Sequence, residues 1–587
     1  MKLRQLTNWD DPSKCIGLVY FAQIVEEMLF DFTLDTYKAS VMHTGLLCAE
    51  GLQTIEEIEN GNIKAPNLWH ITAELCSCFE KDLVAQNMVT LPSSAFYSTL
   101  KNPKSGLNEV RTVLELLSIQ LSGSRYKKRN EELLIQEIKS PQTISTIRGL
   151  ARSYITTLIA VGFHPKHIQS ECINFFYERG SRIAGAESID NFLSLFSLEK
   201  TEFIVIFRTG KIFEQVSGAF PEERLLITHN LPDDVDLTSY PAFNHQGSLY
   251  AIARQISARD IFSARNGAES ILKLAATLLT IYHHKEHPSW ISECIVQNAT
   301  TKAYYKIANP INSMQKCADL LPAVASTRLK LLVQEFSLDK DSFAKFVRSA
   351  QLHSMALGSN TDENQILNLW ISLESLIPSE SKGDDISNIE HIVNSLVPFL
   401  NIGYVEGLIN CLVKDLLIWN ATDTRKALKK IEGKKFIDRL AKGLVLKDFA
   451  PSLASLEGQL HAFPLLHDRF EYLRHLLSSP TNVVNSLDAH KTRLEWQIRR
   501  IYRTRNIIVH SGKTPSYTKT LIEHTHGYLD IVLSMLVNMA SKPKVIHSVE
   551  QGFKYADLQY ATYYGALSQK GLSFDKNNID ALLFSRA

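Results

Sequence analysis

The sequence has no excess of charge of either sign and no long apolar run. Lysine and arginine total 63 residues, against 62 aspartates and glutamates, so no whole-protein field attracts nucleic acid. Any site for an anionic ligand therefore has to be a local patch. No stretch of about eighteen apolar residues predicts a membrane span. The N-terminus also lacks the apolar core of a secretion signal, so we expect a cytoplasmic protein.

Cysteine pairs are also missing. The eight cysteines form no Cys-x-x-Cys motif, and they are scattered as Cys15, Cys48, Cys76, Cys78, Cys172, Cys294, Cys317 and Cys411. This pattern predicts reduced thiols, with no disulfide framework and no zinc site built from cysteine.

Apolar spacing predicts a mainly α-helical protein with several domains, because 587 residues exceed the size of a single core. Residues 1–195 are expected to form a mostly helical N-terminal domain, and 196–320 a mixed region with a small β insert at about 196–255. Residues 321–541 are expected to form a helical bundle, and 542–587 a helical tail. The N-terminal domain includes a predicted αα-hairpin between 143 and 179.

The β insert is predicted from three short segments. Residues 202–208 are β-branched and aromatic, end at Thr209-Gly210, and are followed by 211–216 as a second strand. Residues 224–229 are a candidate third strand. Strand alternation would then place Arg224 and His229 on opposite faces, which excludes them as a joint site.

A basic stretch at 122–130 is predicted to be a turn-rich loop. Arg125, Lys127 and Lys128 can contact phosphates there, and Tyr126 can stack on a base. The alternative is an ordinary solvated loop.

Two groups of histidines are candidates, one for a metal site and the other for the lining of a catalytic cleft. His283 and His287 are four residues apart, but no third ligand is identifiable, so solvated histidines at a helix end are the alternative. His524 and His526 follow the motif described below and can line its cleft. Residues two apart on a helix do not face one another, however. We therefore predict no metal ligands and no cofactor.

The most informative stretch lies near the end of a helix predicted at 486–509. Its apolar stripe consists of Leu494, Ile498, Ile501 and Ile508. Arg505 occupies a stripe position, where a charge is costly unless it is paired or faces a polar cleft. Asn506 follows it, and His510 precedes Gly512, the predicted helix stop. The same Arg-to-His spacing recurs at 224–229 and at 348–353. Arg348 and His353 should point in different directions from the middle of a helix, as ordinary surface or core-edge groups.

The segment Arg505-Asn-Ile-Ile-Val-His510 resembles the active motif of HEPN ribonuclease domains: arginine, a polar residue that is often asparagine, three or four further residues, and histidine. Upstream, Gln365–Leu376 contains Leu-Glu-x-Leu and resembles the earlier helix of the Apea-like HEPN branch. The resemblance covers roughly the last two-fifths of the chain. Residues 1–320 resemble no family of known activity.

The resemblance implies a metal-independent RNA endonuclease whose products carry a 2′,3′-cyclic phosphate and a 5′-hydroxyl. Arginine suits phosphate oxygens, histidine can move a proton near neutral pH, and no acidic cluster spaced for Mg²⁺ lies nearby. We expect Arg505, Asn506 and His510 to be catalytic. Arg499, Arg500 and Arg503 are expected to add positive charge for RNA.

HEPN motifs pair across a dimer, so the resemblance also implies a homodimer through the C-terminal bundle, with the stripe facing the twofold axis. It further implies bacterial defence against phage by cutting tRNA or other RNA, with the N-terminal region as sensor of a phage-derived trigger.

Three points stay open in the sequence. Glu374 is either the ionic partner of Arg505 or solvent-facing. The protein is alternatively a catalytically silent RNA- or protein-binding scaffold, in which Arg505 and Glu374 form a structural ion pair. A further alternative is that the protein is the toxin of a toxin–antitoxin pair and is silenced by an antitoxin.

Overall fold

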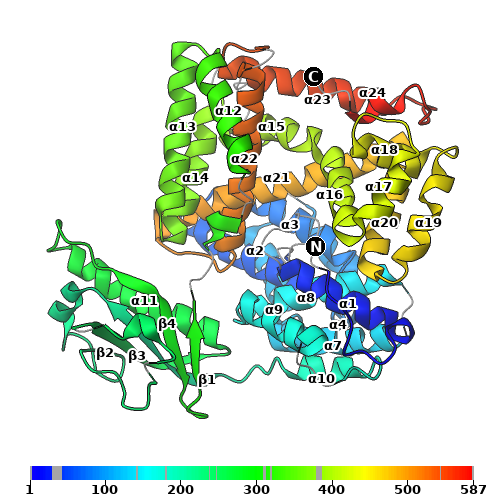
Figure 1. Ribbon diagram of the computed structural model, residues 1–587. Coiled ribbons are helices and arrows are strands. Elements are labelled where there is room, and N and C mark those ends of the chain that lie inside the picture. Colours follow the sequence, from blue (N-terminus) through cyan, green and yellow to red (C-terminus); the bar gives the residue numbers. More distant parts are fainter. Residues whose placement is uncertain are drawn as a thin grey trace.

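A computed structural model describes residues 3–584 except 30–41, 103, 141–142, 179–181, 237, 246, 309–311, 317–319, 379–386 and 542–543. Cys317, the end of the predicted αα-hairpin and the start of the predicted tail at 542 lie outside the described residues. The fold is mainly α-helical with one small antiparallel sheet, as predicted (Figure 1).

The N-terminal region is helical. Its helices are α1 (Ile16–Leu29), α2 (Thr44–Glu59), α3 (Pro66–Phe79), α4 (Leu83–Met88), α5 (Ser93–Leu100), α6 (Leu107–Gln120), α7 (Gly123–Lys139), α8 (Ile144–Ala160), α9 (Pro165–Ile173) and α10 (Ser188–Ser194). Helix α1 is buried along almost its whole length, because most of its residues are apolar and its two glutamates, Glu26 and Glu27, form ion pairs with arginines. The predicted hairpin corresponds to α8 and α9, within the described residues.

The prediction of a loop at 122–130 is wrong, because this stretch forms the start of α7. Tyr126 is fully buried there, where its hydroxyl donates to an Asp82 carboxylate oxygen at 2.8 Å. Its ring stacks on that of His43, with the centroids 4.1 Å apart. Tyr126 is therefore a core residue and has no free face for a base.

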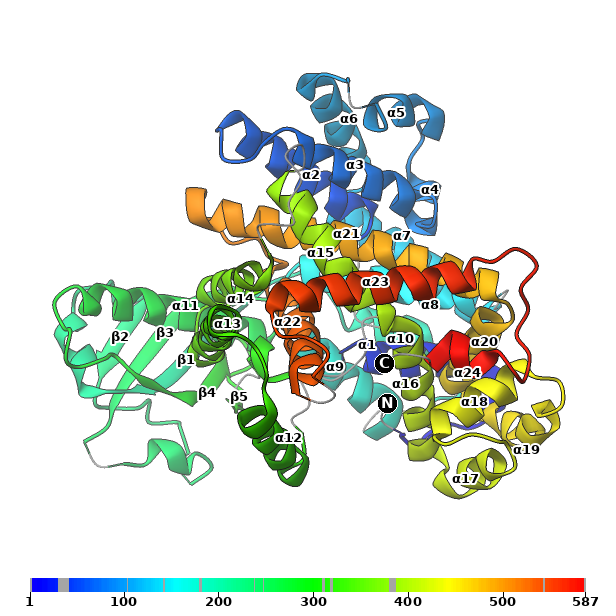
Figure 2. The same cartoon turned by 90° about the horizontal axis from the view of Figure 1, so that it is seen from above.

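The sheet has five strands in the order β2-β3-β1-β4-β5, all pairs antiparallel. The elements are β1 (Thr201–Thr209), β2 (Leu225–Thr228), β3 (Leu249–Ala258), β4 (Trp290–Asn298), β5 (Tyr304–Ile307) and α11 (Ile261–Thr280). Helix α11 covers one face, where Ala268 and Leu272 share a core with Phe207. Figures 1 and 2 show this unit to one side of the larger helical part.

Two predictions about the sheet need correction. Residues Lys211–Val216 form a short 3₁₀-helix and not a strand, with Phe213 fully buried beneath the sheet. The β insert also extends well beyond 255, because β4 pairs with β1 after a long crossover through α11. That pairing joins residues about ninety positions apart, which local sequence patterns do not reveal.

The C-terminal region is again helical. Its helices are α12 (Pro322–Glu335), α13 (Lys340–Gly358), α14 (Asp362–Leu376), α15 (Asn388–Ile402), α16 (Tyr404–Trp419), α17 (Ala421–Lys429), α18 (Phe436–Val445), α19 (Ala450–Leu460), α20 (Pro464–Leu477), α21 (Pro480–Ser511), α22 (Thr518–Ser541), α23 (Val549–Leu567) and α24 (Ile579–Phe584).

Two helical cores organise the protein. One combines α14, the first part of α15, the C-terminal half of α21, α22 and α23. The other combines the N-terminal helices with buried residues from 402–487 and from the end of the chain. The predicted ranges 1–195 and 321–541 therefore share a core, and α21 contributes buried residues to both.

Among the described residues, one helical stretch, Asn388–Trp419, is long and apolar enough to cross a membrane by composition. Its most apolar window is 61% buried inside the protein. A core helix of a soluble protein passes the same test, so the stretch is weak evidence for a membrane span.

Candidate functional site at the end of helix α21

Helix α21 carries the predicted motif and is bounded by clear signals at both ends. Ser479 caps its N-terminus by accepting from the Asn482 amide, and Pro480 occupies the first position. Gly512 ends it in the left-handed conformation at φ +66°, where its amide donates to the Ile508 carbonyl. At 32 residues the helix is about 48 Å long and runs through the helical part of the protein (Figure 2). The predicted stop at Gly512 is confirmed.

The apolar stripe of α21 packs inside the chain itself. Leu494, Ile498 and Ile501 are at most 3% exposed, and Ile508 is 8% exposed. All four belong to the core shared with α14 and α22. The expectation that this stripe faces a twofold axis is therefore wrong, because its own bundle already covers it.

Arg505 lies half-buried between these stripe residues. Its Nη1 donates to the Asn506 side-chain oxygen at 3.0 Å, and its Nε is buried without a hydrogen-bond partner. Within the described part of the chain, no carboxylate lies within ion-pair distance of this guanidinium. Asn506 is itself buried, at 8% exposure. The motif thus places an uncompensated positive charge at the edge of the core.

The predicted pairing of Arg505 with Glu374 is not present in the structure. Glu374 is exposed and accepts a hydrogen bond at 3.1 Å from the indole of Trp370, one turn earlier on α14. Trp370 in turn packs on Tyr502 of α21, with ring centroids 5.7 Å apart. Glu374 therefore has a local partner on its own helix and faces solvent, which is the second of the two alternatives left open by the sequence, and it does not support Arg505.

His510 is exposed in the last turn of α21. It lies five positions after Arg505 on the helix, which places the two residues about 140° apart around the axis and about 7.5 Å apart along it. Within one chain, the guanidinium and the imidazole therefore leave the helix in different directions.

The three arginines predicted to bind RNA beside the motif are all buried in ion pairs. Arg499 donates to Glu390 at 2.6 Å. Arg500 contacts both Glu50 oxygens, at 2.9 and 3.0 Å, and Glu74 at 2.5 Å. Arg503 donates to Glu50 at 2.6 Å. This prediction is wrong, because acidic residues from distant parts of the sequence neutralise the local charge.

Glu50 is 3% exposed and is the centre of this buried network. Burial alone would raise the pKa of its carboxyl, but the guanidinium groups of Arg500 and Arg503 hold it below the ordinary value. Burial instead dominates at Glu74 and raises its pKa. Since Glu50 lies on α2 and Glu74 on α3, the network fastens two N-terminal helices to α21 just before the motif.

The other predicted RNA-binding residues lie on α7. Arg125 and Lys128 are exposed, whereas Lys127 is 7% exposed and pairs with Glu131 at 2.6 Å. Lys127 is thus a structural residue, and the basic stretch offers two solvated cations in place of a continuous phosphate-binding loop.

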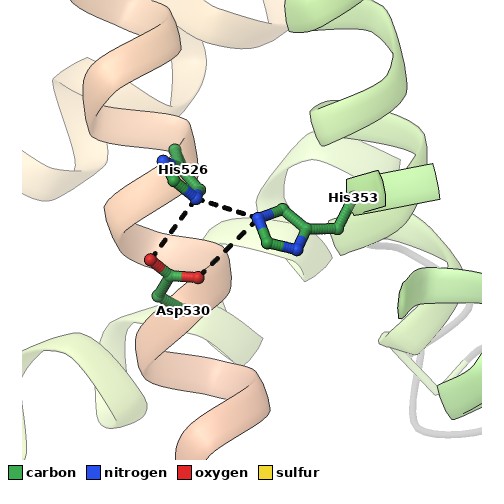
Figure 3. A group of neighbouring side chains, drawn as sticks. All are labelled: His353, His526 and Asp530. Atoms are coloured by element: carbon green, nitrogen blue, oxygen red, sulfur yellow. Dashed lines mark hydrogen bonds and ion pairs between the residues drawn. The ribbon is translucent and has the colours of Figure 1, made fainter. Parts of the chain in front are cut away.

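A second group of reactive side chains, which the sequence did not predict, lies between α13 and α22. His353 comes from α13, and His526 and Asp530 come from successive turns of α22 (Figure 3). The two imidazole Nε2 atoms face each other at 2.8 Å. Asp530 oxygens lie 3.9 Å from His353 Nε2 and 3.5 Å from His526 Nε2. Each residue offers one donor atom, and these atoms lie within 4.8 Å of one another.

The two rings in this group can share a hydrogen bond only when at least one of them is neutral. Burial lowers the pKa of His526, and burial together with the neighbouring His526 lowers the pKa of His353. Burial raises the pKa of Asp530, although His353 opposes that effect. Both shifts on the histidines favour the neutral ring, which is the form that binds metals.

Two of these three residues have a spacing in the sequence that indicates their proximity. His526 and Asp530 are four residues apart, a spacing that places two side chains on one helix face. His353 was interpreted as an ordinary surface or core-edge group, because nothing local indicates that α13 approaches α22. His524 lies elsewhere, with its ring near Tyr528. His283 is half-buried and His287 is exposed, and neither belongs to a metal-like group in the described chain.

A pocket of about 640 Å³ is lined by residues of α16, including Glu406 and Asn410, and by Lys435, Phe436 and Ile437 at the start of α18. None of the motif residues lines it. Comparison of the chain with models of protein families, with curated proteins and with solved structures finds no match.

Proposed function

We propose that the protein is a metal-independent RNA endonuclease of the HEPN type, with Arg505, Asn506 and His510 as its catalytic residues. The observation that carries this proposal is the isolation of Arg505. Every other arginine between 499 and 505 is neutralised by a glutamate, whereas Arg505 has none among the described residues. A half-buried guanidinium without a counter-ion is costly unless it serves a bound anion.

The same observation weighs against the scaffold alternative. That alternative assigns Arg505 to a structural ion pair with Glu374, but Glu374 instead binds the Trp370 indole. A purely structural role thus lacks the contact that would explain an arginine at a stripe position. The bundle of α13, α14, α21 and α22 corresponds, in this proposal, to the HEPN domain.

The proposed reaction needs no bound cofactor. The ribose 2′-hydroxyl attacks the adjacent phosphorus while a His510 imidazole accepts its proton. The bond from phosphorus to the 5′-oxygen breaks, and that oxygen takes up the proton from the imidazolium that has just formed at the same His510. Arg505 stabilises the negative charge that develops on the non-bridging oxygens. Asn506, which already accepts from Arg505, fixes the orientation of that guanidinium.

The catalytic cleft in this proposal is formed by two copies of the chain. Arg505 and His510 diverge by about 140° on one helix, so a single copy cannot place both on one phosphate. A twofold dimer that brings together the ends of two α21 helices supplies each arginine with a histidine from the other copy. The dimer surface then consists of groups beside the motif, such as exposed Val509 and His510, because the stripe is covered.

We further propose that the N-terminal region controls the nuclease, in keeping with a defence role against phage. The buried pairs of Glu50 and Glu74 with Arg500 and Arg503 link α2 and α3 rigidly to α21. A trigger that displaces these helices would move the motif directly, since Arg503 is only two residues from Arg505. An antitoxin that restrains the same joint is the second form of control consistent with this link.

We expect purified protein to cleave total tRNA or mRNA in the presence of EDTA. The fragments should carry 2′,3′-cyclic phosphates and 5′-hydroxyls, because the ribose itself supplies the nucleophile. Mapping both ends by ligation-dependent sequencing checks this. Fragments with 3′-hydroxyl ends, or cleavage that requires added Mg²⁺, would contradict the proposal. A matched control is the Arg224→Ala, His229→Ala double variant, which removes an exposed pair with the same spacing and should cleave normally.

A further inference from the structure

The group formed by His353, His526 and Asp530 has the donor set and the convergence of a metal site. Two imidazole nitrogens and a carboxylate point toward a common centre from two helices (Figure 3). Zinc is held by such nitrogen and oxygen donors at about 2.0–2.2 Å, so two ligand atoms of a tetrahedral site lie about 3.3 Å apart. The two imidazole nitrogens are closer than that, at 2.8 Å. One Asp530 oxygen lies 3.5 Å from His526 Nε2 and the other lies 3.9 Å from His353 Nε2, so the carboxylate has to turn by a small amount to offer one oxygen to a shared ion.

The two helices hold these side chains near the required positions before any ion binds. His526 is 4% exposed, so neighbouring side chains surround its ring. Asp530 lies one turn further along α22, on the same face. Helices α13 and α22 both pack against α14, so the distance between their backbones is fixed by the bundle. Reaching the geometry of a zinc site requires the two Nε2 atoms to separate by about 0.5 Å, which small ring rotations supply.

We propose that His353, His526 and Asp530 bind one divalent transition-metal ion, with Zn²⁺ the ion that the donor set fits, and that this ion clamps α13 to α22. The hydrogen bond between the two imidazoles joins the same two nitrogens that the ion would bridge. Three protein donors leave a fourth position for water. That position faces solvent, because the side chains of Asp530 and His353 are 43% and 21% exposed.

The site is separate from the proposed nuclease motif. None of its ligands lies on α21, and the motif residues contribute no donor to it. The ion's effect is on the stability of the bundle, because it joins two helices that are each held by α14. Metal binding and RNA cleavage can therefore succeed or fail independently.

The test is a titration of the full-length protein, stripped with EDTA and desalted, with Zn²⁺ by calorimetry at pH 7.5. We expect one high-affinity ion per chain and a thermal midpoint that rises by a few degrees in excess zinc. Co²⁺ in place of zinc should give the visible absorption of a four- or five-coordinate site. Asp530→Asn and His353→Ala should each weaken zinc binding by at least about 100-fold.

Two variants outside the group serve as controls for the zinc titration. His287→Ala removes an exposed histidine outside the group, and Arg505→Ala removes the motif guanidinium; both should bind zinc as the wild type does. Asp530→Asn preserves side-chain shape at a partly exposed position, so its fold should survive, which circular dichroism verifies. The proposal would be overturned if the wild type binds no stoichiometric zinc, or if Asp530→Asn and His353→Ala both bind zinc with the affinity of the wild type.

Discussion

Replacing Arg505 or His510 by alanine should lower the rate of RNA cleavage by about 100- to 1,000-fold while the protein stays folded. Among the arginines between 499 and 505, only Arg505 has no glutamate partner in the described part of the chain. Its loss therefore removes charge stabilisation that the neighbouring arginines cannot replace. Arg505→Lys should restore only part of the rate, because an ammonium lacks the planar fork that contacts two phosphate oxygens. Initial rates on one mapped tRNA substrate measure these effects.

The stability of the same variants separates chemistry from folding. His510 is exposed, so His510→Ala should change the free energy of unfolding by less than about 0.5 kcal/mol. Arg505→Ala removes an unpaired guanidinium from the edge of the core and should not destabilise the bundle greatly. Wild-type cleavage rates in both variants would exclude these residues from the mechanism.

Glu50→Ala should destabilise the protein by about 3–5 kcal/mol, because it removes the carboxylate with which two buried arginines pair. Arg503 would lose the carboxylate to which it donates, and Arg500 would keep its contact with Glu74. The loss lies at the joint between α2 and α21, so unfolding of the N-terminal helices should begin at lower denaturant. Urea unfolding followed by circular dichroism and by limited proteolysis measures both effects.

Glu56→Ala is the matched control for Glu50→Ala. Glu56 lies on the same helix but is exposed, so its replacement should cost less than about 0.5 kcal/mol. Equal stability of the two variants would show that the Glu50 network contributes little. The proposed mechanical link between the N-terminal helices and the motif would then lose its physical basis.

Local patterns in the sequence predicted much of the helical fold. The stripe at Leu494 to Ile508 identified α21 and its buried face, and Gly512 identified its end, because helical periodicity and the left-handed stop are properties of neighbouring residues. The same local signals misplaced 211–216, where an apolar run short enough for a strand forms a 3₁₀-helix.

The charge of the candidate site could not be predicted in this way. The sequence indicates a basic patch formed by Arg499, Arg500 and Arg503. Two of these arginines, Arg500 and Arg503, are however neutralised by glutamates more than 400 positions away. His353 and His526 are likewise 173 positions apart and meet only because α13 and α22 share a bundle. Contacts of this separation depend on the tertiary fold, and one sequence carries no signal for them.

The most direct test of the account mixes two inactive variants. Arg505→Ala and His510→Ala proteins are combined, dissociated and reassociated, and the rate of RNA cleavage in EDTA is compared with that of each variant alone. Because Arg505 of one copy is proposed to act with His510 of the other, each mixed dimer keeps one intact pair. The mixture should then recover about a quarter of the wild-type rate, since half of its dimers are mixed and each has one of two pairs. A mixture no more active than its separate components would contradict the composite cleft.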